Sequence, residues 1–399
     1  MLQPQLSIIP SVPVWKKGSE LLFDRKFYDG VIHYCHAWPG PVRCIMTEGP
    51  VQLPDFGIVR MKPGMLPFSC TLIASGTEIG KAHLAGSSIV LASGDAYNQL
   101  HIAGVCRKLG IPCVYVIEYI PETRYQIAAL TTRNPLKLLR HFLFIWNQEQ
   151  KRKQAFITAD ALQSNGTPAY EHYHQATNRL LYFDTRVSKE DLITTDALEQ
   201  RLEKLNEGKP LRLAFSGRLI SMKGADHLVR LALILKQSGM AFLLTIYGKG
   251  ELEGWMNAFI AKHHLGNHIR MPGALDFRKE LLPEISRNTD LFVCLHRQSD
   301  PSCTYLETLS CGVPIVGYAN RAFSGLLASG DIGWSAPTGD LNGIRDLIIE
   351  LDKQRIIIAQ KARNSILFAK EHDFESTFAK RTEHLLSMVS SKPIQEMQP

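Results

Sequence analysis

The chain has 399 residues, of which 45% are hydrophobic and 21% charged, and its formal net charge at pH 7 is +7. This length exceeds one ordinary hydrophobic core, which favours two domains. No apolar run reaches the ~18 residues that a membrane span needs, and the N-terminal stretch MLQPQLSIIP lacks the basic and apolar regions of a secretory signal. These features argue against an integral membrane protein and a secreted one, so we expect a cytoplasmic location.

The eight cysteines are scattered and form no Cys-x-x-Cys pair, so we expect free buried thiols and neither a zinc site nor a disulfide framework. Basic residues concentrate between His101 and Lys153, where Glu118, Glu122 and Glu149 are the only acidic residues. Such a surface attracts anionic partners, although a solvated helix face has the same composition. The basic residues are not organised with exposed aromatic ones, so no nucleic-acid partner is expected.

Strands and helices alternate along the first half. We predict strands over 6–10, 42–46, 88–93 and 112–117, and helices over 97–109 and 134–156. Gly18 marks a turn, and Ser19 is a candidate N-cap for a further helix that begins near Glu20. This alternation is typical of βαβ units around a parallel sheet.

The predicted helix over 134–156 carries an apolar stripe with basic residues beside it. The stripe consists of Leu136, Leu139, Leu143 and Trp146. Lys137, Arg140 and His141 lie next to it. Such a helix either packs its apolar face on the sheet, which is the commoner arrangement, or lies on a membrane surface with its basic residues toward the headgroups.

A charged, helix-prone stretch over 189–210 is predicted to connect two domains, after which the alternation restarts. We predict strands over 211–216, 241–247, 268–271, 291–295 and 314–318. Helices are predicted over 225–237, 251–264, 277–287, 304–310, 340–353, 355–371 and 375–387. The tail over 391–399 is expected to fray. The fold class is therefore α/β, with two successive doubly wound domains.

The loop after the strand over 291–295 leads into a short helix. The amides of Ser302, Cys303 and Thr304 open this helix and cannot all pair within it, and the positive end of the helix dipole lies behind them. We expect them to bind a phosphate or sugar hydroxyls. Glu307 lies about one turn further and suits the two neighbouring hydroxyls of a ribose, although a surface glutamate on a crossover helix fits the pattern equally well.

Two cations follow the strand over 211–216. Arg218 offers a planar fork and Lys223 a point charge, and together they suit a diphosphate, although two unrelated surface cations would give the same pattern. Three strand ends carry loops that suit anions, over 217–224, 247–250 and 296–304. Because the carboxyl ends of parallel strands meet at one edge of a doubly wound sheet, we expect these loops to converge.

The runs GRLISMKG, IYGKGELE and DPSCTYLETLSCGVPIVGY resemble the C-terminal half of the GT-B retaining glycosyltransferases of family 4, also called glycosyltransferase group 1. The resemblance covers about residues 211–363, and the motifs occur in the family's order. It implies two Rossmann-like domains that face each other across a cleft, with a C-terminal helix crossing back to the first. We accordingly expect an acceptor-binding domain over 1–205, a nucleotide-sugar-binding domain over 206–375, and the returning helix and tail over 376–399.

The resemblance also implies roles for individual residues. Arg218 and Lys223 would hold the diphosphate and stabilise the departing charge, and Glu307 would bind the ribose. Catalysis is assigned to Arg218, Lys223, Glu307 and Asp300. The donor-binding residues are expected to be Gly18, Gly217, Gly248, Ser299, Ser302, Cys303, Thr304 and Glu307. The donor would be a UDP- or GDP-linked sugar, with no metal and no further cofactor, and no Asp-x-Asp pair of the metal-dependent fold occurs.

One departure from the family pattern lies in the donor loop. The family commonly has two glutamates separated by seven residues; the second matches Glu307, but the first falls on Ser299, with Asp300 one place later. Either Asp300 meets the sugar hydroxyls instead, or the donor contact differs.

Two further departures lie in the first domain. Lys17 stands in place of the first glycine of a pair, and Glu118 with Tyr119 stands where a histidine is common. The acceptor-side candidates are Asp95, His101 and Glu118. A histidine on an amphipathic helix, such as His101, is more often structural.

The implied function is hexose transfer, with retention at the anomeric carbon, to a glycan or lipid-linked acceptor in bacterial surface polysaccharide biosynthesis. A peripheral contact with the anionic inner face of the plasma membrane is a further expectation. Two alternatives stay open: a nucleotide-sugar epimerase of the same architecture, and a non-catalytic sugar-nucleotide-binding subunit, which the shift from Ser299 to Asp300 keeps open.

Overall fold

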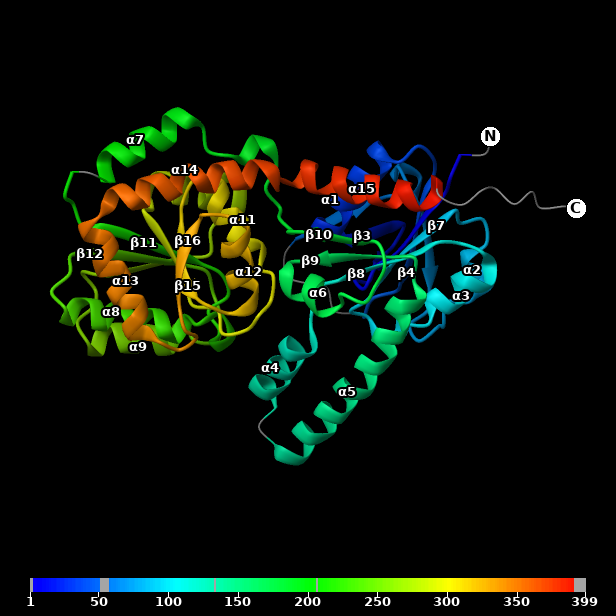
Figure 1. Ribbon diagram of the computed structural model, residues 1–399, viewed down its shortest axis with the longest axis horizontal. Coiled ribbons are helices and arrows are strands. Elements are labelled where there is room, and N and C mark those ends of the chain that lie inside the picture. Colours follow the sequence, from blue (N-terminus) through cyan, green and yellow to red (C-terminus); the bar gives the residue numbers. More distant parts are fainter. Residues whose placement is uncertain (1–2, 51–56, 133, 206, 391–399) are drawn as a thin grey trace, which may run out of the picture.

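The computed structural model describes residues 3–50, 57–132, 134–205 and 207–390. Two α/β domains lie side by side, and a hairpin of two helices projects away from both (Figure 1). The first domain runs from blue to green along the chain and adds the red helix at the end of the chain, the second runs from green through orange, and each contains one parallel sheet. The predicted α/β fold with two such domains is therefore confirmed. The tail over 391–399 lies outside the described residues.

Seven short strands form the sheet of the first domain, in the order β10-β9-β8-β7-β1-β4-β6. The strands are β1 (Leu6–Ile9), β4 (Val42–Thr47), β6 (Ser69–Ile73), β7 (Ile89–Ser93), β8 (Cys113–Ile117), β9 (Ala161–Asn165) and β10 (Arg179–Tyr182). All neighbouring pairs are parallel. The central strands are buried almost throughout, because helices cover both faces of a sheet of this kind.

The helices of the first domain come from distant parts of the chain. They are α1 (Arg25–Ala37), α2 (Lys81–Leu84), α3 (Ile102–Leu109), α4 (Pro121–Thr131), α5 (Pro135–Thr158), α6 (Thr167–His172) and, from the end of the chain, α15 (Phe374–Ser390). α15 packs on α1, β7 and β10, as the returning helix of the predicted fold requires. Gly30 permits this packing, because a Cβ there would lie 2.7 Å from Cζ of Phe378.

The helix predicted to begin near Glu20 is wrong. Residues on either side of Gly18 form two antiparallel strands, and a third strand pairs with the second. These strands are β2 (Trp15–Lys17), β3 (Glu20–Asp24) and β5 (Ile58–Met61). Helix α1 begins after Asp24, whose carboxylate accepts a hydrogen bond from the backbone N of Phe27 at 2.9 Å. Asp24 is the N-cap, whereas Ser19 lies in the hairpin turn.

The sheet of the second domain follows the order β13-β12-β11-β14-β15-β16 and is parallel. The strands are β11 (Leu211–Ser216), β12 (Phe242–Tyr247), β13 (Ile269–Gly273), β14 (Leu291–Cys294), β15 (Ile315–Tyr318) and β16 (Gly333–Ala336). The helices are α7 (Thr195–Leu205), α8 (Ala225–Gln237), α9 (Glu253–Lys262), α10 (Leu282–Asn288), α11 (Cys303–Ser310), α12 (Arg321–Ser329), α13 (Leu341–Lys353) and α14 (Arg355–Glu371). The strand order reverses direction at β11 and β14, where loops at the carboxyl edge diverge and ligands usually bind.

The chain crosses between the domains before α7. Leu198, Leu202 and Leu205 of α7 belong to the hydrophobic core of the second domain. This helix therefore packs on the second domain, although the predicted domain boundary places its residues in the first. The crossing segment between β10 and α7 carries residues that reach the candidate site.

Candidate functional site

Lys223 lies at the centre of the site, in the loop between β11 and α8. Its Nζ is 3.1 Å from Oδ2 of Asp300 and 3.5 Å from Oγ of Ser302. Gly224 follows with φ +71°, and a Cβ there would lie 2.1 Å from the carbonyl oxygen of Leu295. Only glycine lets the loop lie this close to the end of β14. The structure thus brings the Lys223 ammonium to the start of α11.

The loop between β14 and α11 contains unsatisfied polar atoms. Oδ1 of Asp300, Nδ1 of His296 and Oε1 of Gln298 are buried, and none has a hydrogen-bond partner among the described residues. Burial, together with the Lys223 charge, holds the pKa of His296 well below its ordinary value, so the ring is neutral. Since buried polar atoms are normally paired, three such atoms in one loop indicate room for a polar ligand.

Ser299 is held by the first domain. Its backbone N donates to Oε1 of Gln126 at 3.2 Å, and its carbonyl accepts from Oγ1 of Thr123 at 3.1 Å. Its hydroxyl oxygen accepts from the backbone N of Arg321 at 3.2 Å. The acidic group that this loop offers to a ligand is therefore Asp300, one place after the position that the family pattern gives to a glutamate.

Gly217 and Gly248 bring the ends of β11 and β12 together. Gly248 has φ +131°, and a Cβ there would lie 1.9 Å from the carbonyl oxygen of Gly217. Gly217 itself has φ +154°. Both conformations disfavour residues with a side chain, so the two glycines shape the edge beside the Lys223 loop.

Helix α11 presents Cys303 and Glu307 toward the first domain. Its N-cap, Ser302, forms no side-chain cap hydrogen bond with the described residues. Sγ of Cys303 is 3.0 Å from Nζ of Lys26, which also pairs with Asp184. Burial, with Asp184 adding to it, raises the pKa of Cys303 to about 12, so its thiol is neutral. Glu307 is buried, and its Oε1 accepts a hydrogen bond from Nε of Arg186 at 2.8 Å and forms an ion pair with Nη2 at 2.8 Å.

Glu118 and Asp95 lie at the carboxyl edge of the first sheet. Asp95 accepts hydrogen bonds from the backbone N of Glu118 at 2.9 Å and of Tyr119 at 3.1 Å, and it pairs with Arg124. Asp95 therefore holds the loop in place. Oε2 of Glu118 accepts from Nδ2 of Asn165 at 3.3 Å. Burial, followed by the charges of Asp95 and Asp184, raises the pKa of Glu118 to about 7.

The pKa of Glu118 makes a testable contribution to stability. Between its ordinary value of 4.5 and about 7, the folded protein keeps the proton that the unfolded chain has lost, so stability falls as pH rises through this window. Glu118→Gln removes the effect, and its melting temperature relative to wild type should be higher at pH 8 than at pH 4.5. The matched control is Glu122→Gln, whose side chain is 45% exposed. Parallel pH profiles of wild type and Glu118→Gln would contradict the shift.

Three predicted residues form no contact with the groups of this cluster among the described residues. Arg218 is exposed, and its side chain forms no hydrogen bond or ion pair with any residue that the structure describes. Gly18 is exposed at the β2–β3 turn, where no described atom outside the adjoining residues lies within 4 Å of its Cβ position. His101 is 2.9 Å from the carbonyl oxygen of Ile79 and lines a separate groove of about 850 Å³.

Apart from Asp95 and Glu118, the residues that the first domain and the crossing segment contribute to the site were not predicted. Lys26 lies in the first turn of α1, whose predicted start is wrong. Asn165, Asp184 and Arg186 lie at or just after strands that were also not predicted. β9 and β10 follow α5 in chain order, and the signal for them in the sequence is a pair of short, partly apolar runs after that helix.

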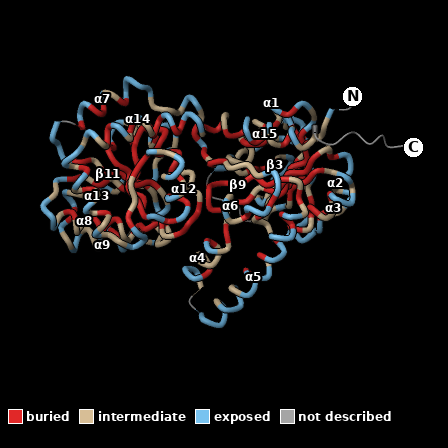
Figure 2. The backbone as a smooth tube through the Cα atoms, in the orientation of Figure 1, coloured by how far each residue is buried: buried red, intermediate tan, exposed pale blue. Residues whose placement is uncertain are grey.

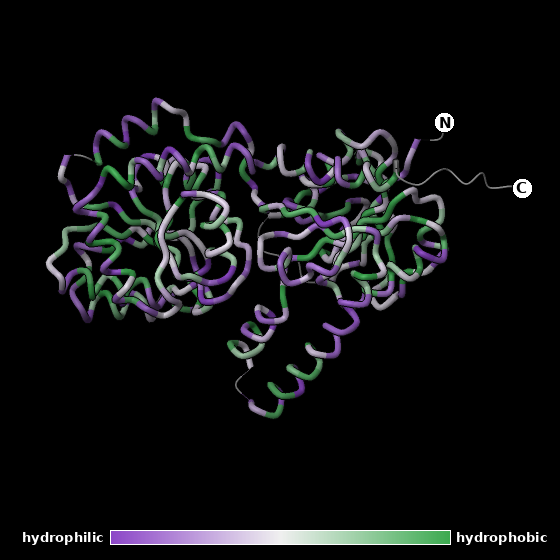
Figure 3. The backbone as a smooth tube through the Cα atoms, in the orientation of Figure 1, coloured by the Kyte–Doolittle hydropathy of each residue, from purple (hydrophilic) through white to green (hydrophobic). Residues whose placement is uncertain are grey.

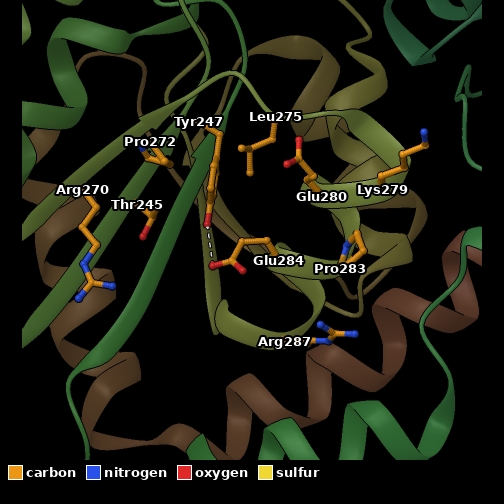
Figure 4. Close-up of a pocket in the computed structure, with 10 residues that line it drawn as sticks. All are labelled: Thr245, Tyr247, Arg270, Pro272, Leu275, Lys279, Glu280, Pro283, Glu284 and Arg287. Atoms are coloured by element: carbon orange, nitrogen blue, oxygen red, sulfur yellow. Dashed lines mark hydrogen bonds between the residues drawn. The ribbon is translucent and has the colours of Figure 1, made fainter.

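A pocket of about 430 Å³ lies elsewhere in the second domain, between β12, β13 and α10. Figure 4 shows Tyr247 and Glu284 turned toward each other, and the Tyr247 hydroxyl is 3.4 Å from Oε1 of Glu284. Burial and the Glu284 charge raise the pKa of Tyr247 to about 12. None of the predicted site residues lines this pocket, so it is separate from the Lys223 cluster.

Comparison with known proteins finds similarity to glycosyltransferases. Residues 197–367 match the family model of the glycosyl transferases group 1. A stretch of 175 residues is 27% identical to the amylovoran biosynthesis glycosyltransferase AmsK of Erwinia amylovora, covering 39% of this chain and 40% of that protein. The match thus spans about two fifths of the length of this curated relative.

Two crystal structures resemble the whole chain. Anabaena Alr3699/HepE in complex with UDP has a TM-score of 0.64 at 12% identity, with 96% of this chain and 100% of that chain covered. WaaG, a glycosyltransferase involved in lipopolysaccharide biosynthesis, has a TM-score of 0.60 at 13% identity, with 95% and 99% covered. At this identity the likeness establishes the fold.

Proposed function

We propose that the chain, whose residues 197–367 match the family model of the glycosyl transferases group 1, transfers a sugar from a nucleotide-diphosphate sugar to an acceptor hydroxyl. The observation that carries the proposal is the Lys223 ammonium at the start of α11, beside the unsatisfied Oδ1 of Asp300. A cation and a helix N-terminus together suit a diphosphate, and a free carboxylate oxygen suits a sugar hydroxyl. The UDP in the Anabaena structure supports a nucleoside diphosphate as the ligand class.

The proposed reaction breaks the bond between the anomeric carbon and the diphosphate oxygen and forms one to the acceptor oxygen on the same face. The acceptor proton passes to the departing phosphate. Negative charge grows on the diphosphate, where Lys223, Arg218 and the first amides of α11 stabilise it without a metal. Glu307 binds the ribose, Asp300 the donor sugar, and Glu118 lies on the acceptor side.

The proposed acceptor is a glycan or a lipid-linked sugar of bacterial surface polysaccharide biosynthesis, and the transferred group is a hexose. The names of the Erwinia relative and of WaaG support this class, since both concern such polysaccharides. We propose UDP or GDP as the nucleotide that carries the hexose.

The test is a panel of UDP- and GDP-sugars, read by thermal shift and by release of the nucleoside diphosphate. Release that depends on an added glycan acceptor and persists in EDTA supports metal-independent transfer. An isomerised sugar nucleotide without acceptor would identify an epimerase instead. Binding with neither release nor isomerisation would identify a non-catalytic subunit.

The proposal includes a peripheral contact with an anionic membrane through the α4–α5 hairpin. The expected packing of the apolar stripe on the sheet is wrong, because the stripe is exposed: Leu136 by 74%, Leu139 by 57%, and Leu143 and Trp146 by 59% each. The hairpin instead closes beside the stripe, where the rings of Tyr125 and Phe142 meet edge to face. Figure 2 shows the exposed length of α5, and Figure 3 shows hydrophobic residues along it.

Charge supports the same contact. The sequence has no acidic residue between Glu122 and Glu149, whereas Lys137 and Arg140 flank the stripe and are exposed. An apolar face bordered by cations suits the boundary between anionic headgroups and acyl chains. None of the helices within the described ranges is long and apolar enough to cross a bilayer.

Replacing Leu139, Leu143 and Trp146 together by Ser should lower partition onto vesicles with 30% phosphatidylglycerol by at least about 10-fold, since each buried side chain contributes about 1.5–3 kcal/mol when fully transferred. Cosedimentation with the vesicles measures the fraction of protein bound. The matched control is Ile356→Ser with Leu367→Ser, two side chains of α14 that are 69% and 61% exposed. Unchanged partition of the triple variant, or equal loss in the control, would contradict the contact.

A further inference from the structure

We propose that Arg186 competes with the ribose of the donor for Glu307, so that nucleotide binding requires this ion pair to open. The inference rests on the proposed function, because it takes Glu307 as the ribose-binding carboxylate. In this proposal Arg186, which lies in the crossing segment, sets how strongly the site prefers a nucleotide with intact ribose hydroxyls.

The pair occupies one oxygen of Glu307. Nε of Arg186 donates a hydrogen bond to Oε1 at 2.8 Å, and Nη2 lies 2.8 Å from the same oxygen as an ion pair. Two guanidinium nitrogens this close leave no room for a hydroxyl donor at Oε1. Oε2 accepts no hydrogen bond from the residues that the structure describes. A ribose presents two neighbouring hydroxyls and binds best when each oxygen of a carboxylate accepts one, so Arg186 blocks one of the two positions.

The guanidinium is held over the site from outside α11. It stacks on the ring of Phe277, with its carbon 4.2 Å from the ring centroid. The backbone beneath it is fixed, because the carbonyl of Arg186 accepts from Nη2 of Arg278 at 3.3 Å and the carbonyl of Val187 from the backbone N of Phe374 at 2.8 Å. The segment stays in place while the side chain moves.

The exposure of the two partners shows which of them moves. The side chain of Glu307 is 9% exposed, whereas that of Arg186 is 47% exposed. When the ion pair opens, water can solvate the exposed guanidinium of Arg186. The buried carboxylate of Glu307 then needs another hydrogen-bond donor. Ribose hydroxyls supply such donors. Because a carboxylate in this position is costly to leave unpaired, the pair is closed when no nucleotide is bound.

The readout is the preference for ribose hydroxyls, measured as the ratio of Kd for 2′,3′-dideoxyuridine 5′-diphosphate to Kd for UDP, with the GDP pair measured alongside. Loss of one positive charge near the diphosphate weakens the binding of both nucleotides equally, so this effect cancels in the ratio. Arg186→Met keeps the packing on Phe277 and removes the donors. If the pair is closed nine-tenths of the time, its removal raises the ratio about 10-fold. Arg186→Lys should give an intermediate ratio.

The matched control is Arg363→Met, which breaks an exposed ion pair of the same domain, with Glu199, and should leave the ratio unchanged. Isothermal titration calorimetry measures the four Kd values for each variant. A ratio in Arg186→Met that equals or falls below the wild-type ratio would overturn the competition and leave the proposed function standing. Failure of UDP and GDP to bind both wild type and Arg186→Met would instead contradict the proposed function, and the competition with it.

Discussion

Lys223→Met is expected to lower kcat by about 10²-fold or more, by analogy with the loss of one donor to a developing negative charge. The Lys223 ammonium is the buried cation that lies at the start of α11, 3.5 Å from Oγ of Ser302. It acts where charge accumulates as the diphosphate departs, so the loss should appear in kcat as well as in KM. Steady-state release of nucleoside diphosphate measures both.

The same substitution should also destabilise the protein, because it leaves Asp300 buried without its partner, at up to about 3 kcal/mol. Adding Asp300→Asn should restore the melting temperature and leave kcat low. Arg218→Ala, at an exposed side chain, should lower kcat without changing stability. Lys262→Met, at an exposed lysine of α9, is the control for charge. Recovery of kcat in the double variant would show that Lys223 serves the fold only.

Gly248→Ala is expected to destabilise the second domain by about 2–4 kcal/mol and to weaken UDP binding at least 10-fold. A Cβ at this position would lie 1.9 Å from the carbonyl oxygen of Gly217, and φ is +131°. The backbone cannot relieve this contact without separating the ends of β11 and β12. Because those ends border the Lys223 loop, the displacement reaches the nucleotide. Chemical denaturation and UDP titration measure the two effects.

Gly239→Ala is the matched control for Gly248→Ala. Gly239 also has a positive φ, +75°, in the same domain, but nothing among the described residues lies within 4 Å of its Cβ position. It therefore reports the conformational penalty alone, about 1–2 kcal/mol. If Gly248→Ala destabilises the protein no more than Gly239→Ala, the close approach of the two strand ends does not contribute.

The second domain follows closely from its sequence because each element has one strong signal. α8 has the predicted bounds, and the strands at its sides are short apolar runs that end in glycine-containing loops. The rule that parallel strands share one carboxyl edge also predicted that the loops of Lys223 and Ser302 meet, and they do so at 3.5 Å across 79 residues.

The first domain was less predictable because its signals compete. Ser19 and Asp24 are both good N-caps, and the three apolar residues between them suit a strand or a helix; the pairing of β3 with β2 and β5 decided the outcome. In α5, Leu138 and Ile145 are as apolar as the exposed stripe. Periodicity therefore could not tell which face packs.

The ion pair of Arg186 and Glu307 had no sequence signal. The two residues are 121 positions apart and meet only because the crossing segment runs past α11. β10, which precedes that segment, is half-buried at three of its four residues and lacks the apolar run that marks a central strand. Contacts of this kind depend on how two domains dock, which local patterns do not encode.

A crystal structure of the chain with UDP tests the central claim most directly. We predict the diphosphate within about 3 Å of Lys223 Nζ and of the first amides of α11, with the ribose at Glu307 and Arg186 turned away. UDP bound elsewhere, for example between β12 and α10 beside Tyr247, with Lys223 still closed on Asp300, would contradict it.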